Sequence, residues 1–145
     1  MLILGLFQSC DEDTLDCSLV DCAGFPSIAF EIVLENENVF EEEVFTIEDL
    51  SLSGNFPQPS KLSIFEAILG DGETPILLLS SMDWKETIYD FNLNIGGEYT
   101  SNLVVEIENS PGGGCCGGIP FIKSLELDEV AIENPNSILT LNFEE

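Results

Sequence analysis

Alternation of apolar and polar residues with a period of two is the feature that most constrains this chain. It runs through residues 87–95 and again through residues 99–107, with Gly96-Gly97 between the two segments. A period of two is typical of a half-buried β-strand. A glycine pair between two such segments favours a two-residue hairpin turn. The sequence therefore predicts an antiparallel hairpin over residues 87–107.

The same signals predict strands along most of the chain. Residues 28–34 alternate, and Ile76-Leu77-Leu78-Leu79 is a continuous apolar run typical of a strand covered on both faces. Other strand-like segments are 44–47, 50–52, 61–69, 119–127, 130–132 and 139–143, with loops or turns at 54–59, 70–75 and 134–136. No segment sustains a helical period. The pattern predicts an all-β fold: an antiparallel β-sandwich of about seven to nine strands, immunoglobulin-like or transthyretin-like in architecture.

The charge balance excludes several functions. Aspartate and glutamate number 28 against 3 lysines, so the formal net charge is −25, and the chain has no histidine and no arginine. Nucleic-acid binding and electrostatic attraction to anionic lipid both need basic residues. Nucleophile pairs that use histidine cannot form, and arginine clamps on phosphates or carboxylates are absent. We expect no enzyme, with a carboxylate pair of the glycosidase type as the remaining alternative.

Two acidic clusters are candidate calcium ligands. They are Glu41-Glu42-Glu43 together with Glu48 and Asp49, and Asp71-Gly72-Glu73. Calcium takes six to eight oxygen ligands, which acidic loops at the ends of a sandwich can supply. Neither cluster matches an EF-hand loop. The alternative is that both belong to a solvated face that serves solubility and salt tolerance. No other cofactor is expected.

The N-terminal segment carries the clearest motif. Leu2 to Phe7 is apolar apart from Gly5 and is far too short to span a bilayer, which needs about 20 apolar residues. The segment Leu6-Phe7-Gln8-Ser9-Cys10 resembles a bacterial lipoprotein signal, although Phe7 stands where that family usually has leucine. The resemblance implies that residues 1–9 are a signal peptide and that Cys10 becomes the lipidated N-terminus. The alternative is that residues 1–9 form the first strand.

Asp11-Glu12-Asp13 follows the candidate lipidation site directly. This acidic run resembles the surface-export signal of lipoproteins from Bacteroidota, including the flavobacteria. The resemblance implies a lipid-anchored protein of the outer membrane, displayed on the cell surface. In a proteobacterium the same aspartate would instead resemble an inner-membrane retention signal. The expected organisation is a signal peptide at 1–9, a lipidated cysteine with an acidic tether at 10–25, and a β-sandwich domain at 26–145.

Four cysteines remain beside Cys10: Cys17, Cys22, Cys115 and Cys116. An even number in an exported protein favours two disulfides. We expect Cys17 and Cys22 each to bond one of the adjacent pair, because a loop of roughly 100 residues closed in this way stabilises by about 4.7 kcal/mol. The alternatives are local Cys17–Cys22 and Cys115–Cys116 bonds, or a four-thiolate metal site, whose usual ligand spacing is absent here.

Two functional classes follow for the domain. The first is a non-enzymatic binding or adhesion module for an extracellular protein or glycan, with Gly54–Ser60 and Asn109–Gly118 as contact loops. The second is a structural accessory subunit that docks on a larger envelope complex through a sheet edge or an apolar patch.

Overall fold

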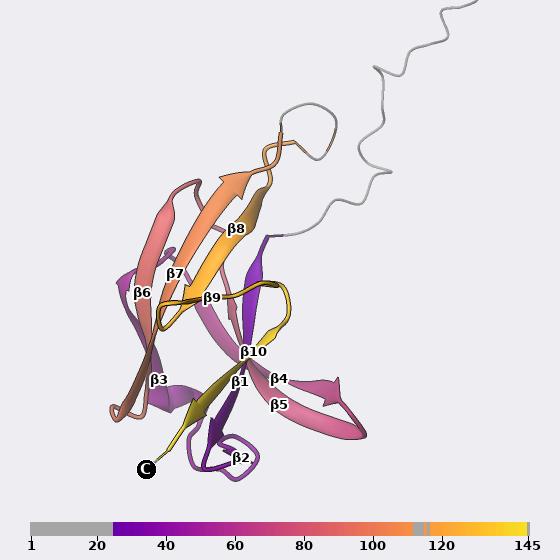
Figure 1. The fold of residues 1–145 in the computed structure, drawn as a ribbon, viewed down its shortest axis with the longest axis vertical. Coiled ribbons are helices and arrows are strands. Elements are labelled where there is room, and N and C mark those ends of the chain that lie inside the picture. The colour runs from indigo at the N-terminus through magenta and orange to yellow at the C-terminus, as the bar shows by residue number, and fades with distance from the viewer. Residues whose placement is uncertain (1–24, 112–114, 116, 145) are drawn as a thin grey trace, which may run out of the picture.

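The computed structural model describes residues 25–111, 115 and 117–144, which form two facing β-sheets (Figure 1). The strands are β1 (Ser27–Leu34), β2 (Glu37–Asn38), β3 (Leu50–Asn55), β4 (Lys61–Leu69), β5 (Gly72–Ser80), β6 (Ile88–Ile95), β7 (Tyr99–Asn109), β8 (Pro120–Leu127), β9 (Val130–Ala131) and β10 (Ile138–Phe143). Within the described residues the only helical element is a 3-10 turn, η4 (Ile47–Asp49). The predicted β-sandwich is confirmed.

The order of the strands shows how the chain closes on itself. One sheet runs β10-β1-β5-β4, with β2 also paired to β1, and the other runs β3-β6-β7-β8-β9. Every pair is antiparallel except β1 with β10, which are parallel from Ala29 opposite Ile138 to Leu34 opposite Phe143. The first and last described strands are therefore neighbours, and this one pair departs from the predicted antiparallel pattern.

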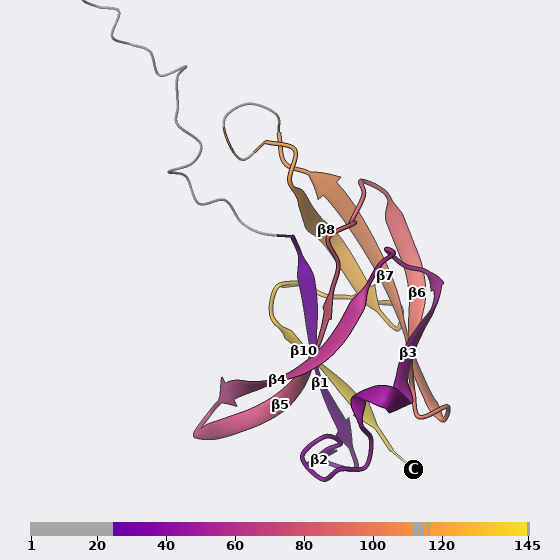
Figure 2. The ribbon, with the colours of Figure 1, turned by 180° about the vertical axis from the view of Figure 1, so that it is seen from behind.

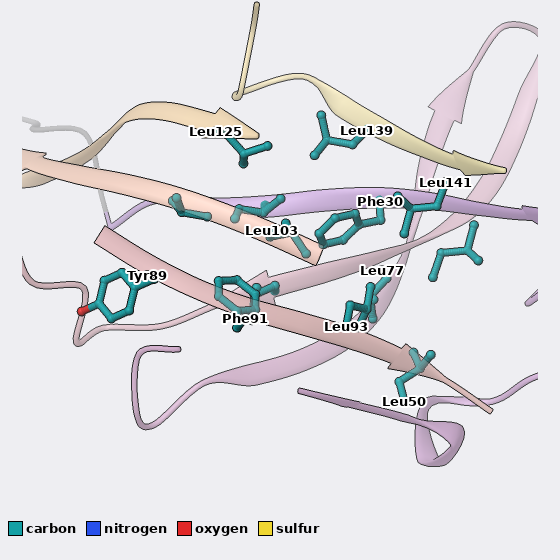
Figure 3. Close-up of a cluster of buried hydrophobic side chains, with 14 of the residues drawn as sticks. Phe30, Leu50, Leu77, Tyr89, Phe91, Leu93, Leu103, Leu125, Leu139 and Leu141 are labelled. Carbon is teal, nitrogen blue, oxygen red and sulfur yellow. The ribbon is translucent and has the colours of Figure 1, made fainter. Parts of the chain in front are cut away.

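The hydrophobic core lies between the sheets and follows the alternation of the sequence. On β6 the buried side chains are Tyr89, Phe91, Leu93 and Ile95. On β7 they are Ser101, Leu103, Val105 and Ile107. In Figure 3, Phe30 and Leu77 of one sheet gather with Phe91 and Leu103 of the other. Full burial of one such apolar side chain stabilises the fold by about 1.5–3 kcal/mol.

The predicted β6–β7 hairpin is confirmed, but its turn is one residue longer than expected. Ile95 pairs with Tyr99, and the backbone N–H of Glu98 donates to the carbonyl of Ile95 at 3.2 Å. Gly96 and Gly97 both take left-handed backbone angles, with φ of 62° and 73°. Those angles strain residues that carry a Cβ, which explains the glycine pair at this turn.

Three local predictions need correction. Residues 44–47 do not form a strand, because the backbone N–H groups of Val44 and Phe45 both donate to the carbonyl of Val39 and fold this segment into a turn. Gly54 and Asn55 continue β3 instead of starting a loop, since the positive φ of Gly54 is accommodated opposite Phe91. The turn predicted over 70–75 is restricted to Gly70 and Asp71, and β5 already begins at Gly72.

The sandwich has two distinct ends. The proximal end holds the start of β1, the β3–β4 loop and the β7–β8 loop, and there the indole N–H of Trp84 donates to the carbonyl of Pro26 at 2.8 Å. The distal end holds β2, η4, the β6–β7 turn and the end of β10. It is tied together by hydrogen bonds from the Gly96 N–H to the Asp49 carbonyl at 2.8 Å and from the Glu35 N–H to the Phe143 carbonyl at 3.0 Å.

The β4–β5 hairpin diverges from the rest of its sheet. β5 pairs with β1 only from Leu77 to Ser80, whereas it pairs with β4 along its whole length. Figures 1 and 2 show the other half of the hairpin projecting sideways from the sandwich. We call this projection, residues 64–76, the arm.

Candidate functional site

A cleft of about 830 Å³ lies beside the arm. One wall is the segment between β2 and β3, and the other is the face of the arm that is turned toward it. The segment contributes Phe40, Glu41, Glu43, Phe45, Thr46 and Ile47, and the arm contributes Ile64, Glu66, Glu73 and Pro75. We call it the arm cleft.

The side chain of Asn38 bonds to residues of both cleft walls. Its Nδ2 donates to the carbonyl of Pro75 at 2.9 Å, and its Oδ1 accepts from the backbone N–H groups of Phe40 and Glu41 at 2.9 and 3.0 Å. Asn38 is buried, so these bonds are shielded from water. A single side chain therefore joins the two walls of the cleft.

Proline at position 75 ends the pairing between β5 and β1. Its carbonyl faces Asn38, so its ring nitrogen, which carries no hydrogen, faces that same side. A further strand on this side would meet a position without a donor, whereas the ladder to β4 loses nothing. The fork in the sheet thus follows directly from the Pro75 backbone.

The wall opposite the arm is held in place by local hydrogen bonds. The backbone N–H of Thr46 donates to Oδ2 of Asp49 at 2.8 Å, which fixes the start of η4. Phe45 packs against Gly96 of the β6–β7 turn, and its ring meets Tyr99 edge to face with centroids 6.3 Å apart. The cleft wall is therefore fastened to the second sheet.

The cleft combines an apolar floor with an acidic rim. Phe40, Phe45 and Ile47 are half-buried and pack against the core, and they provide the floor. The exposed carboxylates of the rim are Glu41, Glu43, Glu66 and Glu73. A cleft of this composition favours a ligand that carries both apolar and cationic groups.

No basic side chain lines this cleft, and the three lysines lie elsewhere. Lys85 is paired with Asp83 at 3.0 Å, and that hydrogen bond raises the pKa of Lys85. Lys123 is paired with Glu108 at 3.2 Å and Glu106 at 3.8 Å; the hydrogen bond to Glu108 is the main cause that raises its pKa. Lys61 begins β4 on the opposite face of that strand. The negative charge of the rim is thus uncompensated within the described residues.

The outer edge of β4 is a second feature of the arm. Among the described strands β4 pairs only with β5, so one side of its backbone is unpaired. Opposed residues in an antiparallel ladder either exchange both backbone hydrogen bonds or neither. Glu66 lies opposite Pro75, whose polar backbone groups face away from β4. Glu66 therefore directs its own N–H and carbonyl outward, and by alternation so do Leu62, Ile64 and Ile68.

Large apolar side chains lie exposed along this edge. Ile68 is 78% exposed, Phe65 41% and Ile64 38%. Ile64 and Ile68 lie on the cleft side of the arm, and Phe65 lies on the other side, so both faces present apolar surface. A long edge strand of this kind is a template for pairing with another chain.

The structure brings together part of the predicted calcium ligands but does not build a metal site from them. Glu41 and Glu43 of the first cluster face Glu73 of the second across the cleft. Asp49 instead accepts hydrogen bonds from Thr46. No group of three or more acidic or cysteine side chains within the described residues is arranged to hold a metal ion. The calcium prediction therefore gains no support.

The predicted lipidation and cysteine sites lie mostly outside the described residues. This applies to Cys10, Asp11, Glu12, Asp13, Cys17, Cys22 and Cys116. Cys115 is described; it is half-buried in the β7–β8 loop and is disulfide-bonded, with its partner outside the described residues. The pairing of the cysteines stays a prediction. No helix of the described segments has the length and apolar character needed to cross a bilayer.

The predicted contact loops lie at the proximal end, away from the arm cleft. Of Gly54–Ser60, the first two residues belong to β3, and of Asn109–Gly118 the residues 112–114 and 116 lie outside the description. A smaller cavity of about 370 Å³ adjoins the first loop, lined by Phe25, Pro26, Pro59, Ser60, Lys61, Ser80, Ser81 and Met82. The sequence pattern does not predict the larger, acidic cleft.

A signal for the arm exists in the sequence. β4 reads Lys-Leu-Ser-Ile-Phe-Glu-Ala-Ile-Leu, with apolar residues at both parities. That pattern differs from the clean alternation of β6 and β7, which each bury one face. Apolar residues on both faces are typical of a strand that is covered on both sides, and the proline inside β5 marks a position where a further strand cannot receive a hydrogen bond.

No protein-family model matches this chain, and no curated protein or solved structure matches it either.

Proposed function

We propose that this protein is a non-enzymatic binding module, held at a cell envelope by lipid on Cys10 and displayed on the outer surface of a bacterium of the Bacteroidota type. The arm cleft is its ligand site, and the ligand is an extracellular protein. The observation that carries the proposal is the placement of the cleft. The described chain begins at the proximal end, whereas one wall of the cleft is formed by the segment that leads from β2 to η4 at the distal end.

This polarity suits an anchored receptor. A tether that joins the sandwich at Phe25 would orient the proximal end toward the membrane and the acidic cleft toward the medium. The lack of histidine and arginine fits a role in binding instead of catalysis. Bonds from Cys17 and Cys22 to Cys115 and Cys116 would tie the tether to the proximal β7–β8 loop, on the same side as the proposed anchor.

The test compares the full chain with its Cys10→Ser variant, both expressed in a bacterium that exports lipoproteins to its surface. We expect the mature wild-type protein to begin at Cys10, to carry acyl chains by intact mass, and to be removed by protease added to whole cells. The variant should lose all three properties. Reduction should increase the mass by the amount for two disulfides. An unacylated wild-type chain that resists the protease would contradict the proposal.

A structural accessory subunit of a larger outer-membrane complex is the second candidate, and the unpaired edge of β4 favours it. Affinity purification from detergent-solubilised envelopes separates the two functions. A stoichiometric membrane-protein partner indicates the accessory subunit, whereas a protein extracted as a monomer indicates the binding module.

A further inference from the structure

Among the described strands, β4 offers the longest unpaired edge. β9 has two residues, β3 ends in Gly54 and Asn55 with φ of 102° at Gly54, and β10 has six residues. β4 extends over nine residues, pairs with β5 in unbroken register from Lys61 to Leu69, and carries no proline. An uninterrupted edge of this length can align a further strand of equal length.

Side chains of an added strand would alternate between two different environments. Those next to Ile64, Glu66 and Ile68 would lie on the side of the arm cleft, where the four glutamates form the rim. Those next to Phe65 and Ala67 would lie on the opposite, apolar side. The edge therefore selects for side chains of two kinds in alternation.

We propose that the outer edge of β4 takes up an extended segment of another protein, in which lysine or arginine side chains alternate with apolar ones. The basic side chains face the cleft and neutralise its glutamates, and the apolar side chains cover Phe65. The segment forms its backbone hydrogen bonds with Leu62, Ile64, Glu66 and Ile68. This inference rests on the proposed function, because it names the class of ligand that the binding module accepts.

A second copy of this chain is the less suitable occupant. Each copy carries a net charge of −25, and pairing of two β4 edges would bring two acidic clefts together. Like charges placed opposite each other oppose association. A basic strand meets the same surface with charges of the opposite sign.

The first experiment titrates the purified domain with three synthetic nine-residue peptides while backbone amide spectra are recorded. In one peptide lysine alternates with valine, in the second glutamate replaces lysine, and the third has the composition of the first with all lysines at one end. We expect saturable binding of the alternating basic peptide, with shifts and slowed hydrogen exchange at Leu62, Ile64, Glu66 and Ile68. The other two should bind at least about tenfold more weakly.

Two variants test the backbone and the charge separately. Ile68→Pro removes an outward N–H while the ladder to β5 stays intact, and Ile68→Thr is its matched control because threonine keeps that N–H. Glu66→Lys reverses one charge of the rim, and Glu126→Lys is the control on an exposed position of the other sheet. We expect loss of binding in Ile68→Pro and Glu66→Lys and near wild-type binding in both controls. Fluorescence of buried Trp84 verifies that each variant is folded.

The outcomes are distinct. Binding of no peptide, or binding that Ile68→Pro leaves unchanged, overturns the assignment to β4. A dimer in sedimentation, with slowed exchange at the same four amides in the absence of peptide, would show that a second copy occupies the edge. That result would also overturn the proposal. Neither result depends on acylation or surface display, so failure of this inference and failure of the proposed function are seen in different experiments.

Discussion

The side-chain amide of Asn38 donates a hydrogen bond of 2.9 Å to the carbonyl of Pro75, across 37 positions of the sequence. This bond lies where β5 leaves β1, and it joins both walls of the arm cleft. The Oδ1 atom of the same side chain accepts hydrogen bonds from the backbone N–H groups of Phe40 and Glu41. Asn38 thus links the shape of the cleft to the stability of the fold.

Replacement of Asn38 by alanine is expected to lower the free energy of unfolding by about 1–3 kcal/mol, because partly buried backbone groups lose their partner. Asn38→Asp should keep the acceptor for Phe40 and Glu41 but lose the bond to Pro75. Asn142→Ala, on the exposed side of β10, is the control. Urea unfolding followed by Trp84 fluorescence measures all three. Equal stability of Asn38→Ala and the control would refute the assigned role.

Ser101 is buried in the core on β7, opposite Leu93, and its hydroxyl has no hydrogen-bond partner. An unsatisfied buried hydroxyl opposes folding. We expect Ser101→Ala to stabilise the protein by up to about 1 kcal/mol. Ser51→Ala, at an exposed position of β3, should change stability by less than about 0.5 kcal/mol. Thermal unfolding of both variants provides the comparison, and a clear loss of stability in Ser101→Ala would show that its hydroxyl is bonded.

Gly96 and Gly97 form a matched pair for testing the β6–β7 turn. A Cβ on Gly96 would lie 2.3 Å from Cε1 of Phe45, whereas one on Gly97 would meet nothing within 4 Å. Gly96→Ala should lower the free energy of unfolding by about 2–4 kcal/mol, because it adds both backbone strain and overpacking. Gly97→Ala should lower it by about 1 kcal/mol, because it adds backbone strain alone.

The clash itself can be isolated by truncation of Phe45. In a Phe45→Ala background the difference between the two glycine variants should shrink, as a double-mutant cycle would measure. A difference that persists unchanged would place the cost in the backbone of Gly96.

Glu108 raises the pKa of Lys123, so Glu108→Gln is expected to lower that pKa toward its ordinary value. Glu106→Gln should lower it less, because Glu106 lies farther from the ammonium group. A raised lysine pKa means that the ammonium group of Lys123 stays charged at neutral pH, and the ion pair is lost as the pH rises through the raised value. Side-chain NMR titration of Lys123 measures the shift. Since Lys123 is an exposed side chain, no change in stability is expected.

Local patterns predicted most strands of this fold, and long-range contacts explain what they missed. The alternation of β6 and β7 requires only neighbours in sequence, and the structure confirms it. The parallel pairing of Phe30 with Leu139 has no local signature, because a period of two does not say which strand lies beside which. The segment at Val44 and Phe45 has strand-like composition, but hydrogen bonds to Val39 fold it into a turn.

Local sequence patterns also do not predict which residues form the arm cleft. Glu41, Glu43 and Glu73 stand in acidic runs that mark them as candidate ligands, whereas Glu66 stands alone among apolar residues in β4 and carries no such signal. Only the fork at Pro75 brings it to the same rim. The lipid anchor at Cys10 and the pairing of the cysteines remain predictions from sequence.

The parallel contact between β1 and β10 sets an order for biogenesis. While the polypeptide is being made, β1 is synthesised about 110 residues before its partner β10. Until Phe143 leaves the ribosomal tunnel, the backbone of Ala29 to Leu34 lacks the partner that covers this side in the folded protein. A nascent chain that still lacks Ile138–Phe143 would therefore expose an unpaired edge of β1 along Ala29–Leu34.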